Sequence, residues 1–427
     1  MTHTDPQLST LTQFFATRFG AETPDHIGVA VSGGGDSLAL LRLMATWGAR
    51  QGVRISAVTV DHGLRAEAAE EAAFVGETCA ALDIAHTTLT WTDWSGAGNL
   101  QDAARRARYK LMADWARAQN ITAIVLGHTL DDQAETFFMR LARASGIDGL
   151  SGMQEQREAH GITWLRPLLT THRADLRQYL RGLDQAWIDD PSNDDEVYDR
   201  VKARKAMAAL SDLGVDAQIV GRVMAQLGQV RSALDHATHA HACHCMRQEM
   251  GDLVIDRAAF VRAPEEVNRR LVSHALRWIA STDYGPRASK LQAFMSAMVQ
   301  GKDATLHGVR LVATAAELRL FREYAAVEGE ILSGSGIWDK RWRIACDKSQ
   351  EFIVRALGDD GLAQLGPRTP ENPPRESLKS TPAVFSGDIL VAAPMAVPVT
   401  PLAQTPLNVS AKLIYPQDHV FTSLLSH

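Results

Sequence analysis

Between residues 26 and 190, short apolar runs alternate with amphipathic stretches that have the spacing of helices. The apolar runs are Ile27–Val31, Ile55–Val60, Ile84–Leu89 and Ile121–Leu126. Nearly continuous apolar strands that alternate with helices are typical of a parallel sheet covered on both faces. The pattern therefore predicts a doubly wound α/β fold. In such sheets ligands bind beyond the carboxyl ends of the strands, so functional residues are expected directly after each run.

The pattern changes further along the chain. From about Arg200 to Glu323 the spacing is mainly helical, although the section 306–320 is typical of a hairpin or of a strand leading into a helix. Spacing typical of strands returns from Ile331. The stretch Gly358–Pro374 is rich in proline and glycine and is predicted to be a loop or linker. A last small element is expected around Ala383–Val391.

A chain of 427 residues is too long for one compact core. We predict three domains: a catalytic α/β domain over 1–205, a mainly helical domain over 206–328 and a small α+β domain over 329–427. With 45% hydrophobic and 22% charged residues, the composition is ordinary for a soluble protein. The start of the chain lacks the features of a signal peptide, no run is long enough to span a membrane, and cysteines number four. These features predict a cytoplasmic protein without a disulfide framework.

The strongest chemical signal directly follows the first apolar run, where Ser-Gly-Gly-Gly-Asp-Ser leads at once into a helical stretch. Glycines allow a tight turn, and the free N–H groups at the start of a helix form an anion site. The loop is neither a Walker A motif nor the G-x-G-x-x-G dinucleotide pattern. The plainer alternative is a glycine-rich turn in which Asp36 or Ser37 caps the helix. The residues of this loop are Ser32, Gly33, Gly34, Gly35, Asp36 and Ser37.

A second candidate motif, Asp61-His62-Gly-Leu-Arg65, follows the second apolar run. An acid and a histidine at the end of a strand, with an arginine three residues later, can orient a nucleotide or its phosphates. The alternative is a helix N-terminus with a local Asp61–Arg65 pair.

The third motif, Gly127–Thr136, follows the fourth run. On a helix, His128, Asp132 and Glu135 would share one face. Thr129 and Asp132 also have the form of a capping box, and acids at a helix start are favoured by its dipole. Capping alone does not require four such residues together. A cluster of His128, Asp131, Asp132 and Glu135 at the edge of a sheet suits either Mg²⁺ or a cationic amine.

The net charge of −6 argues against a strongly basic nucleic-acid-binding domain. Two local clusters could still hold phosphates, or they could be ordinary solvated helix faces. The clusters are Arg105, Arg106, Arg108 and Lys110, and Arg200, Lys202, Arg204 and Lys205.

The motifs together resemble a known family. Besides the three already described, the chain contains QDAARRARY at 101–109, RASGIDGLSGM at 143–153, RPLL at 166–169 and DPSN at 190–193. Their order and spacing are similar to those of the tRNA(Ile)-lysidine synthetases, a family of PP-loop ATP pyrophosphatases with an adenine nucleotide alpha hydrolase-like fold. The resemblance is dense over residues 25–205 and looser at 301–311 and 382–394.

The resemblance implies a reaction in two steps. The oxygen of the wobble cytidine in the CAU anticodon of tRNA(Ile) attacks the α-phosphate of ATP, and pyrophosphate leaves. The ε-amine of free L-lysine then displaces AMP and forms lysidine. ATP and Mg²⁺ are the implied cofactors. The implied partners are tRNA(Ile) and free L-lysine, with no membrane, and a homodimer is the assembly to test.

The resemblance also implies roles for individual residues. The implied catalytic residues are Asp36, His128, Asp131, Asp132 and Arg108. ATP would be bound by Ser32, Gly33, Gly34, Gly35, Asp36, Ser37, His62 and Arg65. The tRNA or lysine would be bound by Asp132, Glu135, Arg200 and Arg204, and Mg²⁺ by Asp36 and Asp131.

Three alternatives remain at this stage. A tRNA thiolase on the same fold would commonly need catalytic cysteines or an iron–sulfur cluster, and the four cysteines are poorly placed for either. A ligase of a free metabolite would release pyrophosphate without tRNA. A non-catalytic tRNA-binding protein with a degenerate ATP site is disfavoured by the intact Ser32–Ser37 loop.

Overall fold

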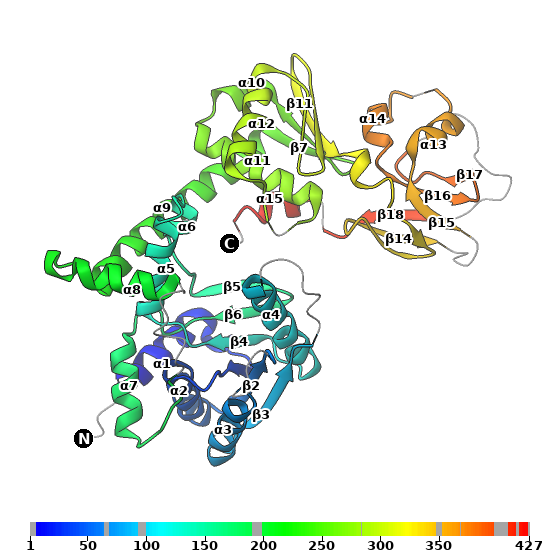
Figure 1. The fold of residues 1–427 in the computed structure, drawn as a ribbon. Coiled ribbons are helices and arrows are strands. Elements are labelled where there is room, and N and C mark those ends of the chain that lie inside the picture. Colours follow the sequence, from blue (N-terminus) through cyan, green and yellow to red (C-terminus); the bar gives the residue numbers. More distant parts are fainter. Residues whose placement is uncertain are drawn as a thin grey trace. The chain divides into compact units, whose positions relative to one another are not determined.

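The computed structural model describes residues 6–63, 68–92, 100–189, 199–282, 284–346, 352–367, 369–396, 409–415 and 418–425. The chain forms two compact units, Met1–Arg231 and Ser232–His427. Figure 1 labels the elements of each unit. The finer division into domains at 205/206 and 328/329 stays a prediction.

The first unit is built on a six-stranded sheet with the order β3-β2-β1-β4-β6-β5. Strand β1 pairs in parallel with β2 and β4, and only β5 runs antiparallel to its neighbour β6. Each of the four predicted apolar runs overlaps one of the first four strands. The strands are β1 (His26–Ala30), β2 (Arg54–Asp61), β3 (Ala85–Thr90), β4 (Ala123–Leu126), β5 (Gln156–Ala159) and β6 (Ile162–Leu165).

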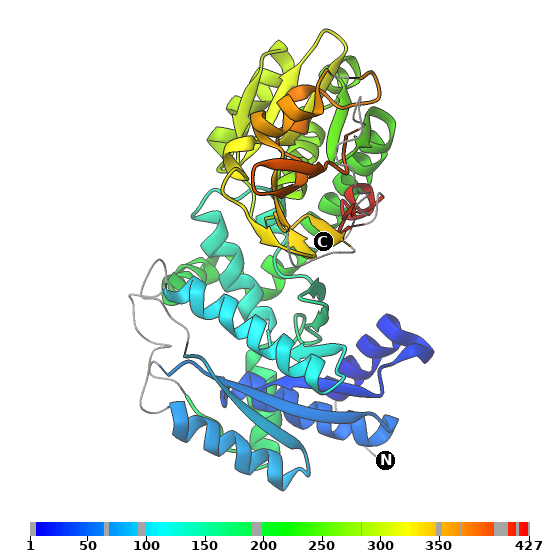
Figure 2. The same cartoon turned by 90° about the vertical axis from the view of Figure 1, so that its right-hand side faces the viewer.

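Helices cover both faces of this sheet, as a doubly wound fold requires. One face carries α1 (Pro6–Phe19), α2 (Gly35–Gln51), α3 (Ala68–Ala81) and α7 (Arg173–Gly182), and the other carries α4 (Leu100–Ala118). Successive side chains of a strand point to opposite faces, so Ala57 packs in the first core and Val58 in the second. In Figure 2 the cyan helix α4 lies on one side of the blue strands, and α2 and α3 lie on the other.

A helical layer follows the fourth strand. Leu130 and Ala134 of α5 pack against Val220 and Met224 of α9 in a separate small core. This core holds α5, the helix with the predicted acidic cluster, against the first turns of α9. The helices of this region are α5 (Leu130–Leu141), α6 (Ile147–Leu150), α8 (Asp199–Leu210) and α9 (Ala217–Cys245), and the 3₁₀ turn η3 (Ser211–Leu213) lies between α8 and α9. A further 3₁₀ turn, η1 (Gly20–Glu22), precedes β1.

The second unit begins with a five-stranded antiparallel sheet in the order β7-β8-β11-β10-β9. The section 306–320 forms part of a hairpin, since β10 and β11 pair antiparallel. Strands β7 and β8 lie within the stretch whose spacing is mainly helical, and they are too short to stand out in it. The elements are β7 (Met246–Glu249), β8 (Asp252–Asp256), β9 (Ala304–Leu306), β10 (Val309–Ala313) and β11 (Glu317–Arg322), with α10 (Arg257–Arg262), α11 (Glu265–Ala280), α12 (Ala288–Gln300) and η4 (Tyr324–Ala326).

The rest of this unit contains two small sheets, β12-β15-β16-β17 and β13-β14-β18. The predicted element around Ala383–Val391 is confirmed as the β16–β17 hairpin. The strands are β12 (Leu332–Ser333), β13 (Gly336–Trp338), β14 (Trp342–Cys346), β15 (Ile353–Ala356), β16 (Pro382–Ser386), β17 (Ile389–Ala392) and β18 (Val409–Leu413), and the short helices are α14 (Arg375–Leu378) and α15 (His419–Thr422).

The loop prediction for Gly358–Pro374 is wrong over its first half, because Gly358–Leu365 forms helix α13. Leu362 and Leu365 are buried in the same core as Phe385. They are three residues apart and therefore share a helix face. The surrounding glycines and aspartates obscured this short apolar face.

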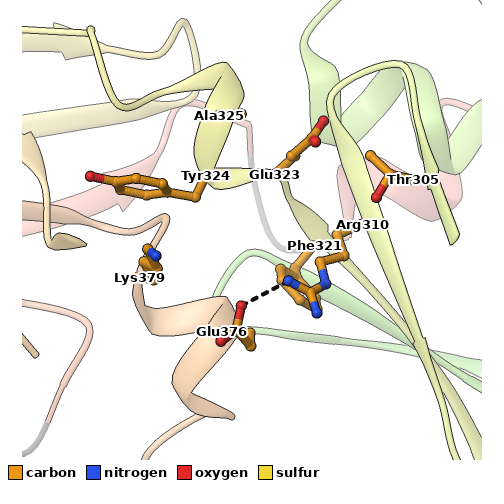
Figure 3. Close-up of a pocket in the computed structure, with 8 residues that line it drawn as sticks. All are labelled: Thr305, Arg310, Phe321, Glu323, Tyr324, Ala325, Glu376 and Lys379. Atoms are coloured by element: carbon orange, nitrogen blue, oxygen red, sulfur yellow. Dashed lines mark hydrogen bonds and ion pairs between the residues drawn. The ribbon is translucent and has the colours of Figure 1, made fainter. Parts of the chain in front are cut away.

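A pocket of about 240 Å³ lies in the second unit (Figure 3). Arg310 points toward Glu376 and forms an ion pair of 2.8 Å with it. Lys379 lies 4.5 Å from the centre of the Tyr324 ring and also pairs with Asp359. Arg310, Glu376 and Lys379 thus already have partners within the protein, and this wall does not define a ligand.

Candidate active site

The Ser32–Ser37 loop joins β1 to the start of α2 in a conformation that suits an anion. Gly33 has a φ of +85°, which favours glycine, and a Cβ there would lie 2.9 Å from Cδ1 of Ile188. Gly34 is the N-cap of α2 and provides no side-chain cap. The first N–H groups of the helix therefore keep their capacity to bind an anion. The alternative in which Asp36 or Ser37 caps this helix is not what the structure has.

The loop is held by its own serines and by the segment after α7. The backbone N–H of Ser32 donates to Oγ of Ser37 at 3.1 Å, and Oγ of Ser37 donates to the carbonyl of Gly34 at 2.9 Å. On the other side, the N–H of Ile188 donates to the carbonyl of Gly33 at 3.0 Å. The loop shape is therefore set before any ligand binds.

The acidic residues predicted from two separate motifs lie together around one arginine. Arg173, the first residue of α7, contacts three carboxylates: Asp36 through Nε at 2.9 Å, Asp132 through Nη2 at 2.9 Å and Glu135 through Nη1 at 3.2 Å. Its backbone N–H donates to Oδ2 of Asp131 at 2.8 Å. All four predicted acids are thus joined to one residue. Arg173 has no role in the sequence-based prediction.

Gly127 explains how α5 comes so close to α2. A Cβ on Gly127 would lie 3.1 Å from both the Asp36 carbonyl oxygen and Cα of Ser37. A side chain at this position would force the end of β4 away from the start of α2. The glycine therefore allows the close approach that places the acids of α5 beside Asp36.

Asp132 has both of the roles that the sequence suggested. Its Oδ2 accepts a hydrogen bond from the N–H of Thr129 at 2.9 Å, and its own N–H donates to Oγ1 of Thr129 at 3.3 Å, which together form the predicted capping box. Its Oδ1 accepts from Arg173. The shared helix face predicted for His128 is wrong, however. Thr129 is the N-cap, so His128 precedes the helix.

A cluster of basic groups surrounds the two predicted histidines. Arg108 of α4 donates to Nε2 of His62 through Nη2 at 2.9 Å, which joins two residues predicted from separate motifs. Burial lowers the pKa of His62, and Arg108 lowers it further, so its ring is a neutral acceptor. Arg65, also predicted for the nucleotide, lies outside the described residues, as does the DPSN motif at 190–193.

His128 is uncharged at neutral pH. Burial lowers its pKa to about 4, and the positive charges of Arg166 and other arginines add to this effect. Its Nδ1 is buried without a hydrogen-bond partner among the residues that the structure describes. The site thus offers a neutral imidazole between arginines.

This state of His128 predicts a pH effect on stability. In the unfolded chain the imidazole takes up a proton near its usual pKa of 6.5, whereas the folded protein resists this down to about 4. The unfolded state therefore binds more protons between these values, and the free energy of unfolding falls as the pH falls. Between pH 7 and pH 4.5, the free energy of unfolding of His128→Asn should fall by about 2–3 kcal/mol less than that of the unchanged protein, as measured by urea unfolding. Equal decreases in the two proteins would contradict a neutral, buried His128.

The second basic cluster lies on α8 and reaches the acids. Arg204 donates through Nε to Oε1 of Glu135 at 2.8 Å, and Nε of Arg200 lies 4.0 Å from Oε2 of Glu135. Arg200 keeps 52% of its side chain exposed, and Arg204 keeps 34%. Arg204 therefore supports Glu135, while Arg200 also faces solvent. Their predicted contacts with a substrate stay predictions.

Sequence reasoning missed two arginines. Arg166 belongs to the RPLL motif but received no role; it is buried and donates to the Gln154 carbonyl at 2.9 Å. Arg173 could have been noticed from its position. A basic residue in the first turn of a helix opposes the helix dipole. Such a residue at the start of an amphipathic stretch indicates that an acidic partner lies elsewhere.

The acid cluster retains the capacity to bind a further cation. Oδ1 of Asp36 and Oε2 of Glu135 are buried and have no hydrogen-bond partner within the described part of the chain. A buried carboxylate oxygen without a donor is costly unless a cation or a donor joins it. Hard cations such as Mg²⁺ and ammonium groups both prefer such oxygens. No group of three or more His, Cys, Asp or Glu side chains in the described part of the chain is arranged to hold a metal ion. Mg²⁺ is commonly held by one or two carboxylates together with substrate phosphates, so these oxygens fit a Mg²⁺ ion that binds with a nucleotide, or a cationic amine.

The chain is similar to known proteins over most of its length. A family model described as a PP-loop domain matches residues 5–211. The tRNA(Ile)-lysidine synthase of Ruegeria pomeroyi is 41% identical over 417 residues, which are 98% of each chain. That of Wolbachia pipientis is 34% identical over 353 residues, covering 80% of this chain and 79% of the relative. Among solved structures, the U34-tRNA thiolase NcsA from Methanococcus maripaludis has a TM-score of 0.44 at 14% identity, covering 52% of this chain and 79% of the other.

Among the described residues, no helix is both long and apolar enough to cross a membrane.

Proposed function

Because the chain belongs to the tRNA(Ile)-lysidine synthase family, we propose that it joins free L-lysine to the wobble cytidine of tRNA(Ile) with the CAU anticodon, forming lysidine. In the first step the cytidine oxygen attacks the α-phosphorus of ATP, and the bond to pyrophosphate breaks. In the second step, the ε-amine of lysine attacks the ring carbon that bears this oxygen. The bond between this carbon and the oxygen breaks, and AMP leaves with the oxygen. The attacking amine gives up its surplus protons to the surroundings. The first step activates the carbon for the second.

The observation that best supports this proposal is the acid cluster directly beside the phosphate-type loop. The loop has an uncapped helix N-terminus, and Asp36 belongs both to that helix and to the cluster. Nucleotide phosphates and a cationic amine can therefore be held within one site. The two steps need a shared site, because the amine must reach the carbon that the reaction with ATP has activated.

Within the site, Asp36 and Asp131 would hold Mg²⁺, which would neutralise negative charge on the phosphates. The Ser32–Ser37 loop would hold the phosphates, with His62 and Arg65 at the nucleotide. Asp132 and Glu135 would hold the lysine ammonium, since Oε2 of Glu135 accepts no hydrogen bond from the described residues and has Nε of Arg200 at 4.0 Å. His128 adds no positive charge that would repel the amine. Positioning and charge complementarity would provide most of the acceleration.

For the tRNA, the exposed arginines are the best-supported contacts. Arg108 lies beside His62 at the end of β2, and Arg200 lies beside the acid cluster on α8. Phosphates of the anticodon loop would meet these groups, while its unstacked base enters the site. A homodimer and a cytoplasmic location stay predictions.

The thiolase alternative is disfavoured by the state of the cysteines. All four are free, and Cys79 and Cys245 are buried. Burial raises the pKa of each of these two thiols to about 11, so neither is a reactive thiolate at neutral pH.

The proposal is tested by measuring pyrophosphate release from ATP and incorporation of labelled lysine into an isoleucine tRNA transcript. We expect release that depends on the tRNA, together with lysine incorporation. Release without tRNA would favour a ligase of a free metabolite. Sulfur incorporation that is independent of lysine would favour a thiolase, and no ATP cleavage with any substrate would indicate a binding protein.

A further inference from the structure

Arg173 occupies the centre of the acid cluster, and it was not expected there. Its side chain is 22% exposed, and its guanidinium uses three different nitrogens for three carboxylates from two helices, α2 and α5. Burial by itself lowers the pKa of Arg173, but Asp132 and Asp36 raise it above its usual value, so the guanidinium stays charged. A planar guanidinium with several donors can contact three carboxylates at once, which an ammonium group does less well.

The position of Arg173 is unfavourable without these partners. It is the first residue of α7, where the helix dipole repels a cation, and it is largely withdrawn from solvent. Burial of an unpaired charge is costly. The three carboxylates offset this cost. The charge of Arg173 is therefore stabilised by the three carboxylates and not by its own helix.

The contacts also divide the carboxylate oxygens in a consistent way. Arg173 takes Oδ2 of Asp36 and Oε1 of Glu135. It leaves Oδ1 of Asp36 and Oε2 of Glu135 buried without a hydrogen-bond partner among the described residues. Oε2 of Glu135 lies 4.0 Å from Nε of Arg200. One guanidinium thus fixes one oxygen of Asp36 and one of Glu135 and leaves the other oxygen of each without a hydrogen bond from the described residues.

We propose that Arg173 is a positioning residue that links the two halves of the site, orienting Asp36 for the nucleotide and Glu135 for the lysine amine while supplying the charge that keeps them in place. This inference rests on the proposed function. Arg173 touches no substrate in this scheme and acts through the carboxylates.

A change at Arg173 should appear in how tightly the two substrates are held. Without the guanidinium, Oδ2 of Asp36 and Oε1 of Glu135 would lose a hydrogen-bond donor, and the carboxylates would repel one another. Neither carboxylate would then be held in its present orientation. The other charged or titratable groups near Asp36 are Asp131, Asp132 and Glu135 on α5, His172 and Arg177 at α7, and Arg204 at Glu135.

The experiment compares Arg173→Met and Arg173→Lys with the unchanged protein. The KM for ATP and the kcat of tRNA-dependent pyrophosphate release are measured, and L-lysine binding to the enzyme alone is measured by calorimetry. For Arg173→Met we expect the KM for ATP to rise by about 10-fold or more, as for the loss of a hydrogen bond to a charged group. We also expect weaker lysine binding.

Arg173→Lys should restore part of the affinity for ATP, since the charge returns, but not the full rate, since one ammonium cannot serve three carboxylates. The matched control is Arg181→Met, which removes an arginine from the last turn of the same helix. Melting temperatures establish that each variant is folded. If both Arg173 variants show a lower kcat with an unchanged KM for ATP and unchanged lysine affinity, Arg173 has only a structural role and the inference is wrong. Failure of the unchanged protein to incorporate lysine would instead overturn the proposed function.

Discussion

Replacing Asp36 with asparagine is expected to reduce tRNA-dependent pyrophosphate release by about 10²–10³-fold, the range found when one preorganised electrostatic contact is removed from an active site. Asp36 stands at the start of α2, beside the loop that would hold the phosphates, and its Oδ1 is buried without a hydrogen-bond partner among the described residues. Asparagine retains the shape and can still accept a hydrogen bond from Arg173. It lacks the charge that a divalent cation requires.

Binding of tRNA should remain nearly unchanged in this variant, because phosphate contacts dominate tRNA affinity and Asp36 makes none. Asp83→Asn is the matched control: it removes an exposed aspartate after α3, at a φ of +56° that asparagine tolerates. Near-normal pyrophosphate release by Asp36→Asn would mean that Asp36 only shapes the start of the helix.

Replacing Glu135 with glutamine should separate the two steps. Its side chain is only 2% exposed, and its Oε2 is the acceptor proposed for the ammonium of lysine. Loss of one partner from a buried charged pair costs about 2–5 kcal/mol. We therefore expect the apparent affinity for lysine to fall by about 30-fold or more, while tRNA-dependent pyrophosphate release falls far less.

The measurement is lysine incorporation as a function of lysine concentration, with pyrophosphate release followed in parallel. Glu77→Gln, an exposed change on α3, is the control. Glu135 also pairs with Arg204, so the melting temperature has to be compared as well. An equal loss in both steps at an unchanged melting temperature would assign Glu135 to the nucleotide half instead.

Several features could be predicted because they depend on neighbours in the sequence. The apolar run at Ile27–Val31 and the glycines after it predict a buried strand and a phosphate-type loop, and both are present. The capping box of Thr129 and Asp132 was visible for the same reason. The errors also have local causes. The sequence pattern puts His128 on the helix, although the helix begins only at Leu130, after the N-cap Thr129. Glycine and aspartate obscure the Leu362–Leu365 face of α13.

The sequence by itself therefore determined the type of fold, the loop and the set of acids, since hydrophobic periodicity and turn chemistry act over a few residues. Only the tertiary structure decided which charges meet. Arg173 and Asp36 are 137 positions apart, and they pair because α7 packs against α2 and Gly127 lets α5 approach the same point. Contacts between distant residues follow from the packing of whole elements. The local pattern at Arg173 could indicate an acidic partner, but not that this arginine would contact carboxylates of both α2 and α5.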